Sequence, residues 1–103
     1  MIKHVVMFKF MDEAMGRSKQ ENMEITASML KNLMGVIPSL LSCQIEYNDP
    51  NADSSNYDFI LITEHEDFEG LNSYIIHPEH QKVGVFMKTV RESRTCVDYY
   101  FEK

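Results

Sequence analysis

The chain has 103 residues, 44% hydrophobic and 25% charged, which are the proportions of a single small globular domain occupying residues 1–103. Its net charge of −6, with ten basic residues scattered along the chain, argues against nucleic acid as a partner, because phosphate binding requires clustered Lys and Arg. No apolar run approaches the roughly eighteen residues that a membrane helix needs, and the run Val5–Phe8 is too short for a signal peptide. Cys43 and Cys96 are expected to be reduced thiols of a cytoplasmic protein, with a disulfide as the alternative.

Residues 2–11 alternate between two apolar faces and predict the first strand. The face expected to point inward carries His4, Val6, Phe8 and Phe10. The segment Ser18–Glu21 then matches a capping box, so a helix is predicted to begin there and to end at about Met34. The buried stripe expected on this helix comprises Met23, Ala27, Leu30 and Met34. Gly35 is expected to stop the helix in the left-handed conformation.

Three further segments alternate as strands do, at residues 40–47, 57–64 and 94–101. The first two are separated by Asn48–Asn56, a run of turn-forming residues. After the third predicted strand, Asp67 can cap a short helix. The residues that recur at helical spacing on this helix are Phe68, Leu71 and Ile75.

The segment Tyr74–Gln81 contains a break between two helical patterns. Pro78 would lose a hydrogen bond inside a helix but fits the first turn, where the N–H has no partner anyway. One helix is therefore predicted to end near Ile76, and another to run from Pro78 to about Val90 with His77 near its cap. The inward stripe expected on this last helix comprises His80, Val83 and Met87.

The predicted order, β-α-β-β-α-β, is that of a ferredoxin-like α+β domain, with a four-stranded antiparallel sheet and its helices on one face. The other face of the sheet stays open, although both strand faces are apolar. Aromatic side chains expected to add to the exposed surface are Tyr47, Phe59, Tyr99 and Phe101. A monomer would expose too much apolar surface, so we expect a homodimer in which two sheets pack face to face and close a barrel.

Four segments resemble the stress-responsive dimeric α/β-barrel family, the Dabb domains. They are the opening run His4–Phe10, the pair Ile37-Pro38, the segment Tyr74–Val83 with its His-Pro-x-His pattern, and the closing Val97-Asp98-Tyr99. The resemblance covers nearly the whole chain, and the His-Pro-x-His segment with a histidine on the first strand is its most specific part. It implies a homodimer with a central barrel, in a family most of whose members have no known activity.

Within that family the segment Tyr74–Gln81 is similar to plant polyketide cyclases that use no cofactor. The resemblance implies His80 as a general base, Tyr74 as its assisting tyrosine and His4 as a pocket histidine on the first strand. This chain departs from the cyclases at Phe59, where they carry another pocket histidine. The departure leaves the substrate open, and the resemblance alone does not establish polyketide chemistry here.

The residues best suited to proton chemistry are His80, Tyr74 and His4. An imidazole titrates at about pH 6.5, which suits a general base at neutral pH. His80 is therefore a candidate general base, and the alternative is a structural histidine bonded to backbone or to Tyr74. The Tyr74 phenol either donates to a developing oxyanion or is a core residue with its hydroxyl at the surface. His77 is expected to cap its helix, and His65, among acidic neighbours, to be a solvated loop residue.

No metal site is predicted, because the break at His77 and Pro78 spoils the helical geometry of a His77–His80 pair and no third ligand is evident. No glycine-rich phosphate loop or nucleophilic triad is found, and no cofactor is expected. A haem or flavin enzyme on the same fold is a further alternative, without a residue pattern that marks its cofactor site.

Two hypotheses of function follow. In one, the chain is a stress-associated homodimer without catalysis, and its histidines are structural. In the other, it is a cofactor-independent cyclase, lyase or isomerase acting on a small apolar carbonyl compound, with His80 as general base. The candidate walls of that ligand site, besides His4, are Phe8, Phe59 and Leu61.

Overall fold

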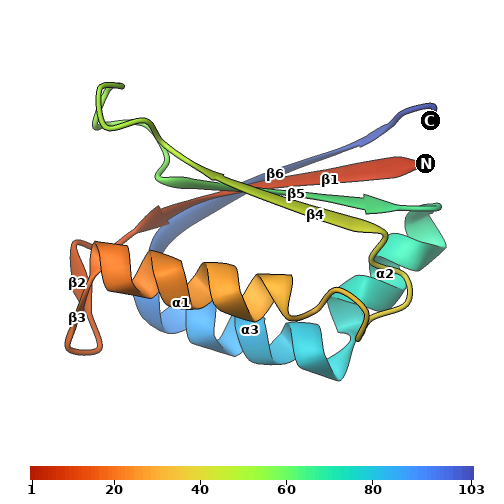
Figure 1. Cartoon of the computed structure of the whole chain (residues 1–103), viewed down its shortest axis with the longest axis horizontal. Coiled ribbons are helices and arrows are strands. Elements are labelled where there is room, and N and C mark those ends of the chain that lie inside the picture. The colour runs from red at the N-terminus through yellow and green to blue at the C-terminus, as the bar shows by residue number, and fades with distance from the viewer.

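The structure, a computed structural model, describes residues 1–103 and consists of one antiparallel sheet covered on one face by helices (Figure 1). The four-stranded sheet has the order β4-β5-β1-β6, which is the strand order of a ferredoxin-like fold. Its strands are β1 (Ile2–Phe10), β4 (Ser42–Tyr47), β5 (Phe59–His65) and β6 (Arg91–Tyr100). The helices are α1 (Lys19–Lys31), α2 (Phe68–Ile76) and α3 (Pro78–Val90). The predicted fold class and helix placement are therefore confirmed.

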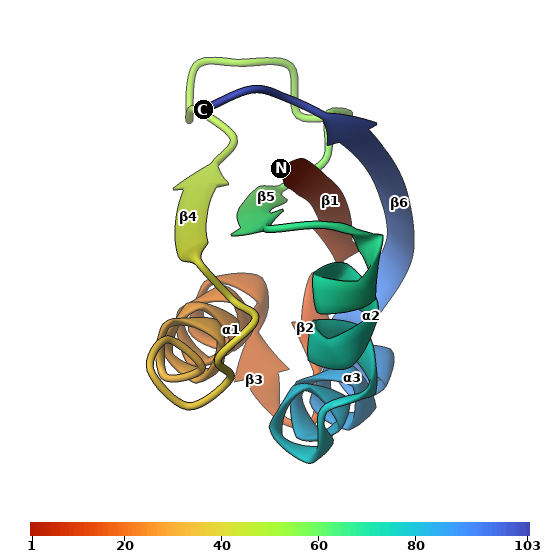
Figure 2. The same cartoon turned by 90° about the vertical axis from the view of Figure 1, so that its right-hand side faces the viewer.

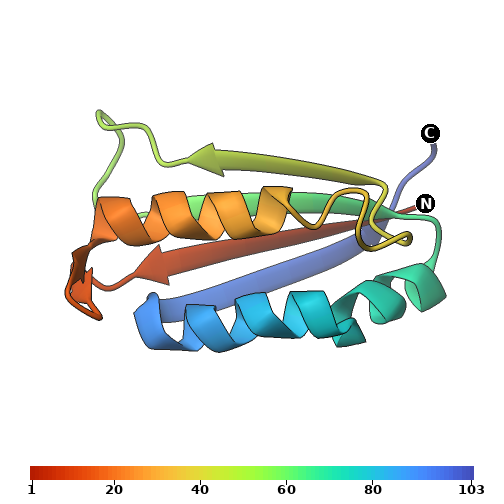
Figure 3. The ribbon, with the colours of Figure 1, turned by 60° about the horizontal axis from the view of Figure 1, so that its bottom comes forward.

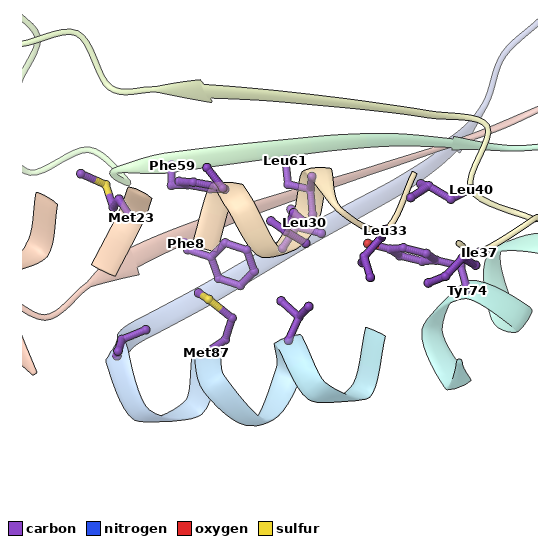
Figure 4. Close-up of a cluster of buried hydrophobic side chains, with 14 of the residues drawn as sticks. Phe8, Met23, Leu30, Leu33, Ile37, Leu40, Phe59, Leu61, Tyr74 and Met87 are labelled. Atoms are coloured by element: carbon purple, nitrogen blue, oxygen red, sulfur yellow. The ribbon is translucent and has the colours of Figure 1, made fainter. Parts of the chain in front are cut away.

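Strand β1 lies in the middle of the sheet and pairs with β5 on one side and β6 on the other. Its alternation is reproduced in full, since every second side chain is buried. These buried residues are Ile2, His4, Val6, Phe8 and Phe10. Figure 4 shows how residues from the sheet, α1 and α3 fill the layer beneath the strands. The core therefore lies between the sheet and the helices, as the sequence predicts.

The connector after β1 forms a small hairpin that the sequence pattern did not predict. Strands β2 (Glu13–Ala14) and β3 (Arg17–Ser18) pair across Met15 and Gly16. Both turn residues have positive φ, 54° at Met15 and 73° at Gly16, as a two-residue type I′ turn requires. Ser18 then opens α1, where its hydroxyl accepts from the Glu21 N–H and the Glu21 carboxylate accepts from the Ser18 N–H, so the capping box is confirmed.

Helix α1 ends at Lys31, one turn earlier than predicted. The chain then continues in tighter turns, in which the Leu33 N–H donates to the Leu30 carbonyl. This change of pitch turns Leu33 into the core and leaves Met34 42% exposed, so the prediction of a buried Met34 is wrong. Gly35 does have positive φ, but it lies in the following turn instead of directly ending the helix.

Three other boundaries or faces differ from prediction. Strand β6 follows α3 without a linker and begins at Arg91, and β5 starts at Phe59 and continues through His65. The inward face of α2 carries Leu71 and Tyr74, while Phe68 remains 61% exposed. Tyr74 thus points toward the sheet, while Ile75 is 37% exposed. Hydrophobicity alone could not distinguish the helix face of Leu71 and Tyr74 from the adjacent face of Phe68 and Ile75.

The break between α2 and α3 is confirmed at His77, which caps both helices. Its own N–H donates to the Tyr74 carbonyl, and its Nδ1 accepts from the Glu79 N–H at 3.1 Å. Because Pro78 has no N–H, the last carbonyls of α2 need other donors. The Ile75 carbonyl accepts from His80 Nδ1 at 2.9 Å and from Gln81 Nε2 at 3.0 Å. The bend therefore fixes the position of the His80 ring.

The face of the sheet away from the helices is uncovered (Figure 2). Its apolar residues, called here the open apolar face, are Val5, Met7, Ile60, Ile62, Val97 and Tyr99. Of the four aromatics expected to be exposed, Phe59 is instead buried on the covered face, at 1% exposure. Tyr47 is exposed as predicted, at 46%, but it pairs with Phe59 on the covered side of the sheet. The exposed aromatic surface is therefore smaller than predicted, although Val97 and Tyr99 are 59% and 45% exposed.

The two cysteines are free and lie on the two edge strands, Cys43 on β4 and Cys96 on β6. Strands β5 and β1 separate them, which excludes the disulfide considered from the sequence. No helix has the length and apolar character to cross a membrane.

Candidate functional site

A cavity of about 160 Å³ lies between α3 and the sheet. Its walls come from β1, β5, α1, α2, α3 and β6, so residues from all parts of the chain meet there. The apolar part of the lining includes Val6, Phe8, Leu30, Leu61, Val83 and Met87. The polar residues fall into two groups: His4, Tyr74 and His80 are one, and Lys88, Arg91 and Arg94 are the other.

His80 faces the ring of Tyr74, with their ring centroids 4.4 Å apart. A carbonyl oxygen can only accept, so the bond to the Ile75 carbonyl places the proton of the neutral imidazole on Nδ1. The other nitrogen, Nε2, therefore keeps its lone pair. Burial lowers the pKa of His80, against the opposing effect of the Ile75 bond, and the nearby His4 and Arg94 lower it further. His80 is thus a neutral imidazole at pH 7, suited to accept a proton.

Tyr74 is 1% exposed and projects from α2 into the layer between sheet and helices (Figure 4). Burial raises its pKa, so the side chain is a neutral phenol able to donate. Its hydroxyl forms no hydrogen bond with another protein group, while the ring lies among three imidazoles. We call these four residues the His–Tyr cluster: His4, His65, Tyr74 and His80. Ser39 Oγ is the one fully enclosed side-chain polar atom without a partner, so the Tyr74 hydroxyl, which has no protein partner either, keeps accessible surface at the cavity that Tyr74 lines.

His4 on β1 is hydrogen-bonded through Nδ1 to the Asp98 carboxylate on β6, its cross-strand neighbour. A carboxylate can only accept, so Nδ1 donates and Nε2 of the neutral ring is the acceptor. The bond fixes the orientation of the His4 ring. The sequence did not single out Asp98, because only the strand register places it opposite His4.

His65 is fully buried at the end of β5, so the prediction of a solvated loop residue is wrong. Its Nδ1 donates to the Ser39 carbonyl at 2.8 Å, and its Nε2 therefore accepts from the Thr63 hydroxyl at 2.9 Å. Burial lowers its pKa, so His65 is neutral in the folded protein. The alternation of Phe59, Leu61 and Thr63, continued by two residues, was the signal that could have placed His65 inward.

The predicted site residues do not all meet. His80, Tyr74 and His4 line one cavity with Phe8 and Leu61. Phe59 is not part of that lining; its ring packs against Phe8 and Phe10 in the neighbouring core, at centroid distances of 6.1 and 5.8 Å.

Three donor groups come together at the β1–β6 pair: His4 Nδ1, Cys96 Sγ and an Asp98 oxygen lie within 4.8 Å of one another. Such a set could offer nitrogen, sulfur and oxygen to a transition metal. A metal would require the thiolate, yet burial and the neighbouring Asp98 raise the pKa of Cys96. The Sγ to Asp98 distance of 3.5 Å suits a weak S–H donor, so the group is satisfied as a hydrogen-bonded set.

The family model for the stress-responsive A/B barrel domain matches residues 2–101. The chain belongs to that family, the Dabb domains. The Arabidopsis thaliana protein DABB1, a stress-response A/B barrel domain-containing protein, is 29% identical over 102 residues. The match covers 99% of this chain and 48% of that protein, so this Dabb domain spans about half the length of the curated relative.

Solved structures share the fold. A dimeric ferredoxin-like protein of unknown function from Bacteroides fragilis has a TM-score of 0.79 and 26% identity, over 97% of this chain and 95% of that chain. A hydroxynitrile lyase from Passiflora edulis has a TM-score of 0.80 at 10% identity, over 99% and 94% of the two chains. At that identity the lyase shows the common fold alone. The resemblance to Dabb domains inferred from four segments of sequence is confirmed, and the family leaves the activity of this member unassigned.

Proposed function

We propose that this Dabb domain is a cofactor-independent enzyme that moves a proton next to the carbonyl group of a small apolar ligand. The observation that carries the proposal is the pairing of two unengaged groups in one cavity, the Tyr74 hydroxyl and His80 Nε2. One is a donor held neutral by burial, and the other is an acceptor on an imidazole whose pKa burial lowers. The bond from Nδ1 to the Ile75 carbonyl holds the His80 ring in place, while His80 Nε2 and the Tyr74 hydroxyl have no hydrogen-bond partner in the protein.

In the proposed step, His80 Nε2 removes a proton from the carbon next to the carbonyl. The C–H electron pair becomes the carbon–carbon double bond of an enolate, and the carbonyl π electrons move to oxygen. The Tyr74 hydroxyl donates a hydrogen bond to that oxygen, where charge develops. In an isomerisation the imidazolium returns the proton to another carbon, and in a lyase step it protonates the oxygen that leaves. In an aldol cyclisation the enolate carbon attacks a second carbonyl carbon of the ligand, and the imidazolium protonates the alkoxide that forms. None of these reactions needs an oxidant. His4, oriented by Asp98, is proposed as a second ligand contact.

Fold neighbours and resemblance support this choice without deciding the substrate. A lyase occurs among the structures with this fold, and the segment Tyr74–Gln81 resembles the plant polyketide cyclases. The cyclases have a pocket histidine at the position of Phe59. In this chain Phe59 lies outside the cavity lining, so the cavity has no counterpart of that histidine. The proposal is accordingly limited to proton transfer on a carbonyl compound.

The test measures α-proton exchange of cyclohexanone in D₂O by NMR, with and without protein. Wild-type protein is expected to accelerate exchange over buffer, and His80→Ala to reduce the acceleration by about 10²- to 10⁴-fold. Gln81→Ala is the matched control, because it removes a donor from the same Ile75 carbonyl and leaves the imidazole in place. Retention of exchange by His80→Ala would overturn the assignment.

The stability of His80→Ala separates this proposal from a purely structural role. A structural His80 predicts a large loss of stability on removal of its bond to Ile75, whereas a ligand-facing His80 predicts a loss similar to that of Gln81→Ala. Thermal unfolding of both variants makes the comparison. A loss confined to His80→Ala, with no exchange activity in wild type, would favour the stress-associated homodimer without catalysis.

We propose that the protein forms a homodimer through its sheet, with the open apolar face of one chain packed on that of another. Exposed Val97 and Tyr99 on that face, and the description of related structures as dimeric, support this arrangement. Val97→Lys is expected to reduce the mass in light scattering to that of one chain. Ile76→Lys is the matched control, because Ile76 is equally exposed, at 61%, but lies on α2. An unchanged mass in Val97→Lys would refute the sheet-to-sheet dimer.

We propose a cytoplasmic location, which the two free thiols on separate edge strands support. Fractionation of cells that express the tagged chain tests it, and recovery in the membrane or secreted fraction would contradict it.

A further inference from the structure

Three basic side chains line the same cavity as the His–Tyr cluster. They are Lys88 and Arg91 at the end of α3 and start of β6, and Arg94 farther along β6. Their spacing of three residues is a local cluster in a chain whose other basic residues are dispersed and whose net charge is −6. We call them the rim cations. In the sequence these three residues do not stand out, because the basic residues are scattered along the chain.

The rim cations lie at the opposite end of the cavity from the His–Tyr cluster. On β1, His4 is paired with Asp98 and Phe8 with Arg94, and four residues of strand span roughly 13 Å. On α3, eight residues separate His80 from Lys88, a rise of about 12 Å. Figure 3 shows the strands of the sheet and α3 running lengthwise along each other. Strand and helix thus lead from imidazoles to cations over the same length, and the cavity lined by both has two chemically different ends.

None of the rim cations is neutralised by a carboxylate. All ion pairs of the chain involve other residues. Arg94 is exposed and lines the cavity, and its charge adds to burial in lowering the pKa of His80. Three positive charges without acidic partners, converging on an apolar cavity in an acidic protein, form a site for a negative group.

We propose that the ligand of this cavity carries, besides its carbonyl group, an anionic group that the rim cations bind. This inference rests on the proposed function, because it takes the His–Tyr cluster as the site of the carbonyl. An apolar cavity of about 150 Å³ holds benzene, so the whole cavity of about 160 Å³ suits a ring or a chain of about six carbons. The anionic group of such a ligand would extend to the exposed Lys88 and Arg94 at the end of the cavity. The ligand class is therefore a small keto acid or keto phosphate, with its carbonyl at Tyr74 and its anion at Arg91 and Arg94. Arginine binds carboxylate and phosphate alike through paired N–H donors.

The probes are three compounds of similar shape: 4-acetylbenzoate, 4-acetylphenyl phosphate and the neutral 4-acetylbenzamide. Their dissociation constants are measured by calorimetry with wild-type protein and with the double variant Arg91→Gln/Arg94→Gln. Wild type is expected to bind at least one anion roughly tenfold tighter than the amide, and the double variant to lose that preference while still binding the amide. The tighter of the two anions distinguishes a carboxylate from a phosphate ligand. Lys31→Gln is the control, because Lys31 is an exposed lysine outside the cavity lining.

The outcomes separate the two proposals. Equal affinity for anions and amide would overturn the anionic ligand and leave the proposed carbonyl site standing. No binding of any probe would overturn both. If the double variant fails to fold, the same comparison is made with wild type at low salt and at high salt. A preference for anions that salt abolishes supports the inference, and a salt-independent preference or none contradicts it.

Discussion

The two faces of the sheet are built from the same strands and are both apolar, yet they have different roles. The covered face carries the core and, at one end, the His–Tyr cluster. The open face carries Val5, Ile62 and Val97 side by side, with no buried polar group among them. The buried polar side chains of the sheet thus lie only on the face that the helices cover.

The covered face carries oriented polar groups, whereas the open face carries exposed apolar surface. On the covered face, each imidazole of the His–Tyr cluster has one nitrogen fixed by a protein group: Asp98 for His4, Ser39 for His65 and Ile75 for His80. Such fixed orientation is what a chemical site requires. The open face offers exposed apolar area, which suits association between like surfaces. The comparison predicts that equal truncations on the two faces have unequal effects.

The largest effect is expected for Phe10→Ala, because Phe10 is 2% exposed on the covered face and packs against Phe8 and Phe59. Deleting a buried aromatic ring removes about 3–5 kcal/mol of unfolding free energy. Chemical denaturation measures the loss. Tyr99→Ala on the open face is the matched truncation and should change the stability of the isolated chain far less. Equal losses at the same protein concentration would mean that the open face is as buried as the covered one.

A smaller loss is expected for His65→Leu, which leaves the Ser39 carbonyl and Thr63 hydroxyl without their partner. An unsatisfied buried group costs about 1–3 kcal/mol. Denaturation at pH 8 measures this loss, when the imidazole is neutral in both folded and unfolded chains. A variant as stable as wild type at that pH would show that His65 contributes nothing to the covered face.

The same histidine predicts a direction for the pH dependence. Burial lowers the pKa of folded His65, while in the unfolded chain it titrates at about 6.5. Between these two values the unfolded state binds more protons, so wild-type stability is full above about pH 6.5 and falls as pH drops toward the folded pKa. The deficit of His65→Leu should therefore shrink on acidification. A deficit independent of pH from 8 to 5 would contradict a buried neutral imidazole.

The smallest effect is expected for Glu64→Gln on the open side of the sheet. Its carboxylate accepts from the Ser42 hydroxyl at 2.7 Å and lies 3.6 and 3.2 Å from the ammonium groups of Lys3 and Lys103. The Ser42 bond, followed by these cations, lowers the pKa of Glu64. Ion pairs at a surface contribute at most about 1 kcal/mol, and Gln keeps one acceptor for Ser42. A larger loss in denaturation experiments would show that dimer formation desolvates this pair and would sharpen the contrast between the faces.

Local features of the fold could be predicted because they depend on neighbouring residues. The capping box at Ser18, the break at Pro78 and the alternation of β1 follow from backbone donors and side-chain periodicity within a few residues. One failure was also local, in the turn that follows α1. Leu33 replaced Met34 in the core because the chain leaves α1 by tighter turns.

For the candidate site, the sequence by itself determined which residue types were available and that His80 and His4 lie on inward faces. Only the tertiary structure decided that Asp98 meets His4, that His65 joins the cluster, that Phe59 lies outside it, and that the rim cations share its cavity. Periodicity places a side chain on a face, but strand register and helix packing decide which faces meet, because those contacts join residues as far apart as 4 and 98.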